Sequence, residues 1–165
     1  MDRIAEIARR LFDEWGVKAP YETLSGALSV ATLNDAYAAQ LALQSLFTET
    51  RGTIVGRKIA LASKAMQDMC GIDQPIAGAI FADDTHMSGA RVTRADFRHL
   101  GLEFELALEL NNAVAPQARP HTAESVRGLV AGARPAFELI EDKWADYSKL
   151  DVFTLIADNP WSGWI

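Results

Sequence analysis

The stretch Leu102-Glu-Phe-Glu-Leu-Ala-Leu-Glu-Leu110 alternates strictly between apolar and other side chains, and it decides the fold prediction for this chain. Side chains along a β-strand point to opposite faces with a period of two. The leucines and Phe104 therefore share one face of a predicted strand, and we expect that face to be buried. The glutamates share the other face, where Glu103 and Glu105 are neighbours. Carboxylates placed that close repel each other unless a positive charge lies between them.

Two interpretations of this carboxylate face are compatible with the alternation. Antiparallel sheets commonly bury one face and expose the other to water, so the glutamates could form an ordinary solvated surface. Alternatively, the face binds a hard divalent cation such as Mg²⁺, which prefers oxygen ligands. A purely solvated sheet predicts no effect of divalent metals on stability.

Length and composition indicate a globular protein of ordinary domain size. The chain has 165 residues, of which 49% are hydrophobic and 23% are charged. Its net charge of −6 argues against non-specific binding to nucleic acid and, more weakly, against a membrane-surface role. Cys70 is the single cysteine, which excludes an intramolecular disulfide and is typical of the reducing cytoplasm. We expect Cys70 to be buried and inert, and we expect neither a signal peptide nor a membrane span.

Hydrophobic periodicity predicts an α+β fold in which helices come first and a strand-rich body follows. We divide the chain into an N-terminal helical region, residues 1–52, and the first part of a β-rich domain, residues 53–165. Trp161, Trp164 and Ile165 indicate the beginning of a further strand. Helices are expected over 4–16, 32–50, 65–70 and 122–131 and from Ser148 or Asp151 onward, and strands over 53–62, 76–81, 89–94 (short), 102–110 and 135–140.

Five segments match the motifs of one family, in the same order and at similar spacing. The first, Val55–Gln67, resembles the family segment "vGrKiGLTSkamQ". The other four are Gly71–Gly78 ("GvDqPdfG"), Leu102–Ala107 ("iEaEiA"), Pro135–Ile140 ("PalEvv") and Ile156–Asn159 ("vADNas"). The chain thus resembles the N-terminal portion of the 2-keto-4-pentenoate hydratase family. That family lies in the hydratase/decarboxylase branch of the fumarylacetoacetate hydrolase-like superfamily.

The resemblance implies a fold and a site. It implies a β-rich fumarylacetoacetate hydrolase-like catalytic body, here truncated because family members continue well beyond this length. It makes Glu103, Glu105 and Glu138 the ligands of Mg²⁺ or Mn²⁺. It also makes Lys58 the active-site lysine. Ser63, inside the first matched segment, and Asp84, which follows a predicted strand and could line the site, are the predicted substrate-binding residues.

The implied activity is a hydro-lyase that adds water to a 2-hydroxy-dienoate or 2-keto-4-pentenoate-type acid, a step of aromatic meta-cleavage catabolism. In such chemistry the metal polarises the 2-oxo group as a Lewis acid. The expected partners are a small 2-oxo acid substrate and further copies in a homo-oligomer, or a decarboxylase/hydratase assembly. Neither nucleic acid nor membrane is expected, and the expected location is cytoplasmic.

Departures from the family pattern keep two alternatives open. Ile76 stands where the hydratases carry an aspartate for acid–base work, and this apolar residue resembles the sister 4-oxalocrotonate decarboxylases. Ala60 and Ala62 replace a glycine and a threonine, and Lys143 replaces an arginine. The second alternative is a truncated, non-catalytic domain that binds metal or a partner. His86 follows a predicted strand and could line the site, but it is interpreted as a loop histidine. His99 and His121 lack ligand spacing and are interpreted in the same way.

Overall fold

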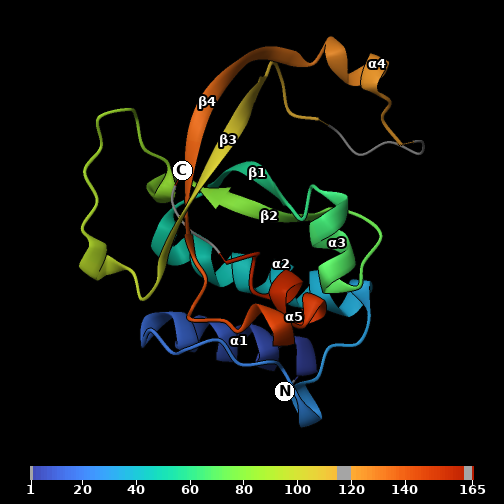
Figure 1. Ribbon diagram of the computed structural model, residues 1–165, viewed down its shortest axis with the longest axis vertical. Coiled ribbons are helices and arrows are strands. Elements are labelled where there is room, and N and C mark those ends of the chain that lie inside the picture. The colour runs from blue at the N-terminus through green and yellow to red at the C-terminus, as the bar shows by residue number, and fades with distance from the viewer. Residues whose placement is uncertain (1, 115–119, 162–164) are drawn as a thin grey trace. The chain divides into compact units, whose positions relative to one another are not determined.

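The computed structural model describes residues 2–114, 120–161 and 165 (Figure 1). The chain forms two compact units, one made of residues 1–101 with 139–165 and the other of residues 102–138. Both helices and antiparallel strands are present, which confirms the predicted α+β class. The predicted division at residue 52 stays a prediction.

The helices of the first unit begin at the capping residues that the sequence supplies. Helix α1 (Arg3–Gly16) begins after Asp2, and helix α2 (Leu33–Arg51) begins after Thr32, whose Oγ1 accepts a hydrogen bond from the backbone N–H of Asp35 at 3.1 Å. Helix α5 (Val152–Ala157) begins after Asp151, which accepts a hydrogen bond from Thr154 N at 2.7 Å. Of the two residues predicted to open this helix, Asp151 is therefore the correct one.

A two-stranded antiparallel sheet completes the first unit. Strand β1 (Ile54–Ala60) pairs with β2 (Ile76–Phe81), and the short helix α3 (Lys64–Cys70) lies between them in the chain. Helix α2 contacts α1, β2 and α5 (Figure 1), so it forms the centre of this unit. The fully buried side chains of the core include Leu11, Leu43, Phe47, Ile76, Phe81 and Ile156.

The second sheet consists of β3 (Leu100–Leu110) and β4 (Val130–Glu141), with helix α4 (Ala123–Arg127) between them in the chain. The predicted helix over 122–131 is wrong at its C-terminal end, because α4 stops before Gly128 and Val130 already begins β4. Of the turn and short strand predicted over 89–94, the strand is wrong. Gly89 lies in a turn, residues 90–93 form no regular structure, and a 3₁₀ helix follows at Arg94–Asp96.

The predicted burial of the apolar face of residues 102–110 is wrong in this structure. The exposed fraction of these side chains runs from 50% at Leu110 to 80% at Phe104. Within the described part of the unit formed by residues 102–138, no further layer covers the two-stranded sheet. The contact on this face is between the rings of Phe104 and Phe137, whose centroids lie 5.2 Å apart. A strand pattern predicts which residues share a face, but a second layer is required to bury them.

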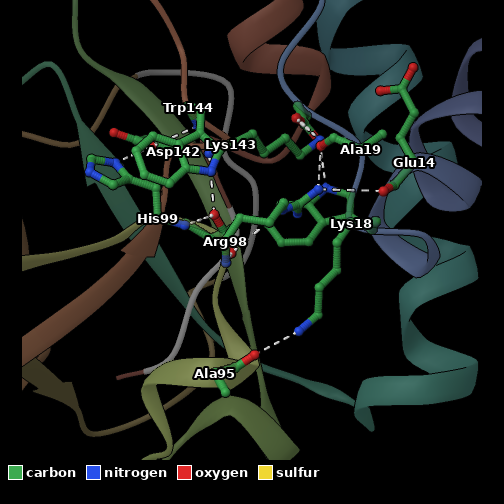
Figure 2. A network of polar contacts seen from close by, with 12 residues as sticks. Glu14, Lys18, Ala19, Ala95, Arg98, His99, Asp142, Lys143 and Trp144 are labelled. Atoms are coloured by element: carbon green, nitrogen blue, oxygen red, sulfur yellow. Dashed lines mark hydrogen bonds and ion pairs between the residues drawn. The ribbon is translucent and has the colours of Figure 1, made fainter.

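Buried polar contacts hold the first unit together around Trp15. The ammonium of Lys143 lies 2.5 Å from Asp158 Oδ2, and Trp15 Nε1 donates to Asp158 Oδ1 at 2.6 Å. The guanidinium of Arg98 donates to the backbone oxygens of Glu14 and Ala19 (Figure 2). In the part of the chain that the structure describes, no helix is long and apolar enough to cross a bilayer.

Candidate metal centre

Three glutamate side chains converge in the unit formed by residues 102–138. Glu103 and Glu105 lie on the same face of β3, and Glu138 lies on β4. One carboxylate oxygen from each of them lies within 4.8 Å of the other two. Glu103 and Glu105 are exposed, whereas Glu138 is buried. The structure therefore brings together the three residues that were predicted to be ligands.

Pairing of β3 with β4 explains this convergence. The rings of Phe104 and Phe137 meet on the opposite, apolar face, and each residue directly precedes or follows one of the clustered glutamates. Further along the carboxylate face, Arg134 forms an ion pair with Glu109 at 2.7 Å. The alternation of side chains then places Glu138 on the same face as Glu103 and Glu105. Glu109 lies on this face as well and pairs with Arg134, a cation from the same sheet.

The donor set suits a hard divalent cation. Mg²⁺, Mn²⁺ and Ca²⁺ prefer carboxylate oxygens, and a cation bound among these groups would relieve the repulsion between their negative charges. Exposed acidic groups also occur without metal, so the geometry alone makes this a candidate site. The ligand roles of the three glutamates stay a prediction.

Lys58 lies in the other unit, on β1, and it is buried, with an exposed fraction of 7%. Its Nζ donates to the backbone oxygen of Trp161 at 3.4 Å. In the β1–β2 sheet Lys58 is opposite Gly78. A lysine on a strand is ordinarily solvated, so its burial is a feature that only the structure reveals.

The two residues predicted to bind substrate have structural partners. Ser63 is the N-cap of α3, and its Oγ accepts a hydrogen bond from Met66 N at 3.3 Å. Asp84 is buried and forms an ion pair with Arg51 at 3.4 Å. Burial raises the pKa of Asp84, although the Arg51 charge acts in the opposite direction. Burial also lowers the pKa of Arg51. The substrate contacts of Ser63 and Asp84 stay predictions.

The structure gives His99 partners that sequence reasoning did not find. Its Nδ1 lies 2.7 Å from Asp142 Oδ1, and its ring stacks on Trp144 with centroids 4.3 Å apart (Figure 2). The partners are more than forty residues apart in the chain, so no local spacing could indicate them.

A second unpredicted feature is a buried amide network that joins Gln40, Gln44 and Asn159. All three side chains are at most 4% exposed. The sequence did contain a signal for this network. Gln40 and Gln44 are four residues apart, so they lie on one face of the helix, among its apolar residues. Buried amides at such positions need hydrogen-bond partners.

No family model matches the chain. Comparison with curated proteins finds relatives that share one name, 2-keto-4-pentenoate hydratase. The chain is 33% identical to a 2-keto-4-pentenoate hydratase of Burkholderia vietnamiensis, over 72% of this chain and 45% of the relative. It is 31% identical to 2-keto-4-pentenoate hydratase 2 of Dechloromonas aromatica, over 87% of this chain and 54% of the relative. The chain thus spans about half the length of the curated relatives it matches.

The fold has a solved counterpart. A structure of 4-oxalocrotonate decarboxylase from Pseudomonas putida G7, complexed with magnesium and adipate, superposes with a TM-score of 0.85 at 23% identity. The superposition covers 99% of this chain and 61% of the decarboxylase chain. At this identity the likeness establishes the fold.

Proposed function

We propose that this chain, a member of the hydratase/decarboxylase branch of the fumarylacetoacetate hydrolase-like superfamily, carries the metal site and the active-site lysine of a hydro-lyase. In this proposal it corresponds to the N-terminal portion of such an enzyme. The substrate class is a 2-hydroxy-dienoate or a 2-keto-4-pentenoate-type acid, by analogy with the hydratase relatives. The convergence of Glu103, Glu105 and Glu138 is the observation that carries this proposal.

The three glutamates would hold Mg²⁺ or Mn²⁺. A divalent cation bound there supplies Lewis-acid polarisation of the 2-oxo group. The carboxylates fit this role because two come from one strand and one from its neighbour, so the sheet itself sets their spacing. The magnesium in the decarboxylase complex supports the same class of ion.

Lys58 would serve the substrate through its ammonium group. A lysine ammonium can pair with the carboxylate of a small acid, or move a proton as part of acid–base catalysis. The buried stem of Lys58 favours such a role, because a shielded ammonium interacts with an anion more strongly than a solvated one does.

A second candidate function is decarboxylation of a vinylogous 2-oxo acid. Ile76 favours this candidate, because its side chain carries no ionisable group and cannot act as a base. It is the first residue of β2 and lies in the hydrophobic core, with an exposed fraction of 1%. An activated water requires a base, whereas loss of carbon dioxide does not. The fold shared with the oxalocrotonate decarboxylase agrees with this candidate.

A third candidate is a non-catalytic domain that binds metal or a protein partner. The exposed apolar face of β3, from Leu102 to Leu110, favours it, because such faces occur at contacts with further protein. The same face would serve a homo-oligomer or a decarboxylase/hydratase assembly if the enzyme proposal holds.

Thermal melting with and without Mg²⁺ or Mn²⁺ tests the metal site. A ligand that binds only the folded chain stabilises it by about 2.7 kcal/mol at a concentration one hundred times its Kd. We expect a metal-dependent rise in Tm that Glu105→Gln abolishes. Glu109→Gln is the matched control, because Glu109 is on the same face of β3 but pairs with Arg134. It should retain the rise.

The outcome separates the candidates. No metal effect on the wild-type Tm, or an equal effect in both variants, would contradict the proposed centre. If the rise depends on Glu105, assays for water addition and for carbon dioxide release, run side by side, distinguish the hydratase from the decarboxylase.

A further inference from the structure

We infer that Asn159 is a positioning residue for Lys58, holding the segment 159–161 in the place where it receives the lysine ammonium. This inference rests on the proposed role of Lys58 in the reaction. It uses only the unit formed by residues 1–101 and 139–165.

The amide of Asn159 binds strand β2 as a neighbouring strand would. Its Oδ1 accepts from Ala79 N at 2.8 Å, and its Nδ2 donates to Ala79 O at 3.1 Å. These two bonds satisfy both the backbone N–H and the C=O of Ala79, which is paired with Arg57 in the register of β1 and β2. Asn159 is completely buried, so neither bond competes with water.

Helix α2 supports this amide from behind. Gln44 Nε2 donates to Asn159 Oδ1 at 2.8 Å and to Gln40 Oε1 at 2.9 Å. Gln40 Nε2 in turn donates to Ala77 O at 2.8 Å and to Ile156 O at 2.7 Å. The two glutamines therefore fix the orientation of the Asn159 amide and join β2 to the end of α5.

Gly78, the neighbour of Ala79, is where this network meets Lys58. A Cβ at position 78 would lie 3.1 Å from Lys58 Cε, 3.1 Å from Pro160 Cδ and 3.2 Å from Asn159 O. The lysine stem and the Asn159–Pro160 backbone thus pass over the same glycine. A side chain at position 78 would require these neighbours to move by a few tenths of an ångström.

The backbone of segment 159–161 is held in an unusual conformation. Asn159 has φ of 54° and Trp161 has φ of 46°, both in the left-handed region. Such residues persist where the surroundings impose them, and asparagine tolerates this region better than most. The Asn159 bonds supply that constraint. As a result, the Trp161 carbonyl accepts from Lys58 Nζ at 3.4 Å.

NMR of the side chains in ¹³C-lysine-labelled protein tests the inference. The chain has five lysines, and Lys58→Arg identifies the Lys58 signal. We expect the two Hε protons of Lys58 to be inequivalent in the wild type and to become equivalent in Asn159→Ala. Lys18, whose Nζ donates to Ala95 O at 3.0 Å in the same unit, is the internal control and should keep its shifts. Lys143 does not serve as a control, because it pairs with Asp158, the neighbour of Asn159. A purely structural role for Asn159 would disturb Lys18 as well.

Two further variants keep the test decisive. Asn159→Gly removes the amide but accepts a φ of 54°, so it should release Lys58 as Asn159→Ala does. Gly78→Ala keeps the Asn159 side chain but places a Cβ against Lys58 Cε, Pro160 Cδ and Asn159 O, so it should also shift the Lys58 signal. This variant provides the test where the asparagine variants do not fold. Unchanged Lys58 signals in the folded variants, or Lys58 and Lys18 signals that change together, would overturn the inference.

The metal experiment remains independent of this one. If Mg²⁺ or Mn²⁺ does not raise the Tm of the wild type, the proposed metal centre is contradicted, whatever the lysine spectra show. A normal metal effect in Asn159→Gly with a displaced Lys58 signal would support both.

Discussion

Lys143→Met tests whether the buried ion pair beside Trp15 is essential to the first unit. Lys143 Nζ lies 2.5 Å from Asp158 Oδ2, and both side chains are 1% exposed. The ammonium also lies 4.6 Å from the centroid of the Trp15 ring. Methionine keeps an unbranched stem of similar length but removes the charge. Position 143 has φ of 53°, and neither residue is glycine, so the backbone strain stays the same.

The expected cost follows from what the substitution leaves behind. Breaking a buried pair by removing one partner typically costs about 3–5 kcal/mol, because the other charge remains buried without compensation. Asp158 keeps its hydrogen bond from Trp15 Nε1 at 2.6 Å, which retains part of its stabilisation. We therefore expect a loss near the lower end of that range, about 3 kcal/mol in the free energy of unfolding.

Urea unfolding followed by circular dichroism measures this loss, with two further variants. Combining Lys143→Met with Asp158→Asn should cost about 2 kcal/mol less than the sum of the single substitutions, since each removes the same interaction. The control is Lys64→Met, because Lys64 pairs with Asp68 on the surface of α3, where both side chains are more than 60% exposed. That change should cost about 0.3–0.5 kcal/mol. A loss in Lys143→Met no larger than in the control, or simple additivity in the double variant, would refute the reasoning.

Three more predictions concern other parts of the chain. Phe104→Ser should change the unfolding free energy by less than about 0.5 kcal/mol, as expected for an exposed side chain, whereas Phe47→Ala should cost about 3–5 kcal/mol in the same urea titration. Burial raises the pKa of Asp84 above its usual value of 3.8. The free energy of unfolding of the wild type should therefore fall relative to that of Asp84→Asn as the pH rises from below 3.8 through the raised pKa. Urea titrations at several pH values measure this difference. Burial also raises the pKa of the Cys70 thiol, so an aromatic disulfide reagent should label it at least about tenfold more slowly in native protein than in urea.

Each of these has an opposite outcome that would count against it. A large loss in Phe104→Ser would mean that the apolar face of β3 is covered in solution. Parallel pH profiles for the wild type and Asp84→Asn would show that Asp84 does not titrate differently on unfolding. Equal labelling of Cys70 in both states would place the thiol at the surface.

Local sequence signals predicted the starts of α2 and α5 and the end of α3 correctly. Thr32 and Asp151 each accept a hydrogen bond at a helix start, and Gly71 ends α3 with φ of 67°. The failures have a physical cause as well. The segment 122–131 contains a good cap and apolar residues, yet pairing with β3 recruits Val130 into a strand. Long-range pairing outweighed local propensity there.

In the candidate site, too, local features were predictable from the sequence, whereas contacts between distant segments were not. The period of two placed Glu103 and Glu105 on one face, but their approach to Glu138 depends on the register of two strands that are distant in the chain. The partners of Lys58, Asp84 and His99 come from residues 33 to 103 positions away. Sequence spacing carries no information about such contacts.

The sequence by itself determined the α+β class, the face that carries the carboxylates and the five motifs that match the hydratase family. These features depend on local periodicity and on residue identity, which are readable without coordinates. Only the tertiary structure decided that the apolar face of β3 is exposed, that Lys58 is buried, and that Asn159 joins β2 to the segment beside it. Burial and buried hydrogen bonds depend on which distant segments pack together, and that packing is a property of the whole fold.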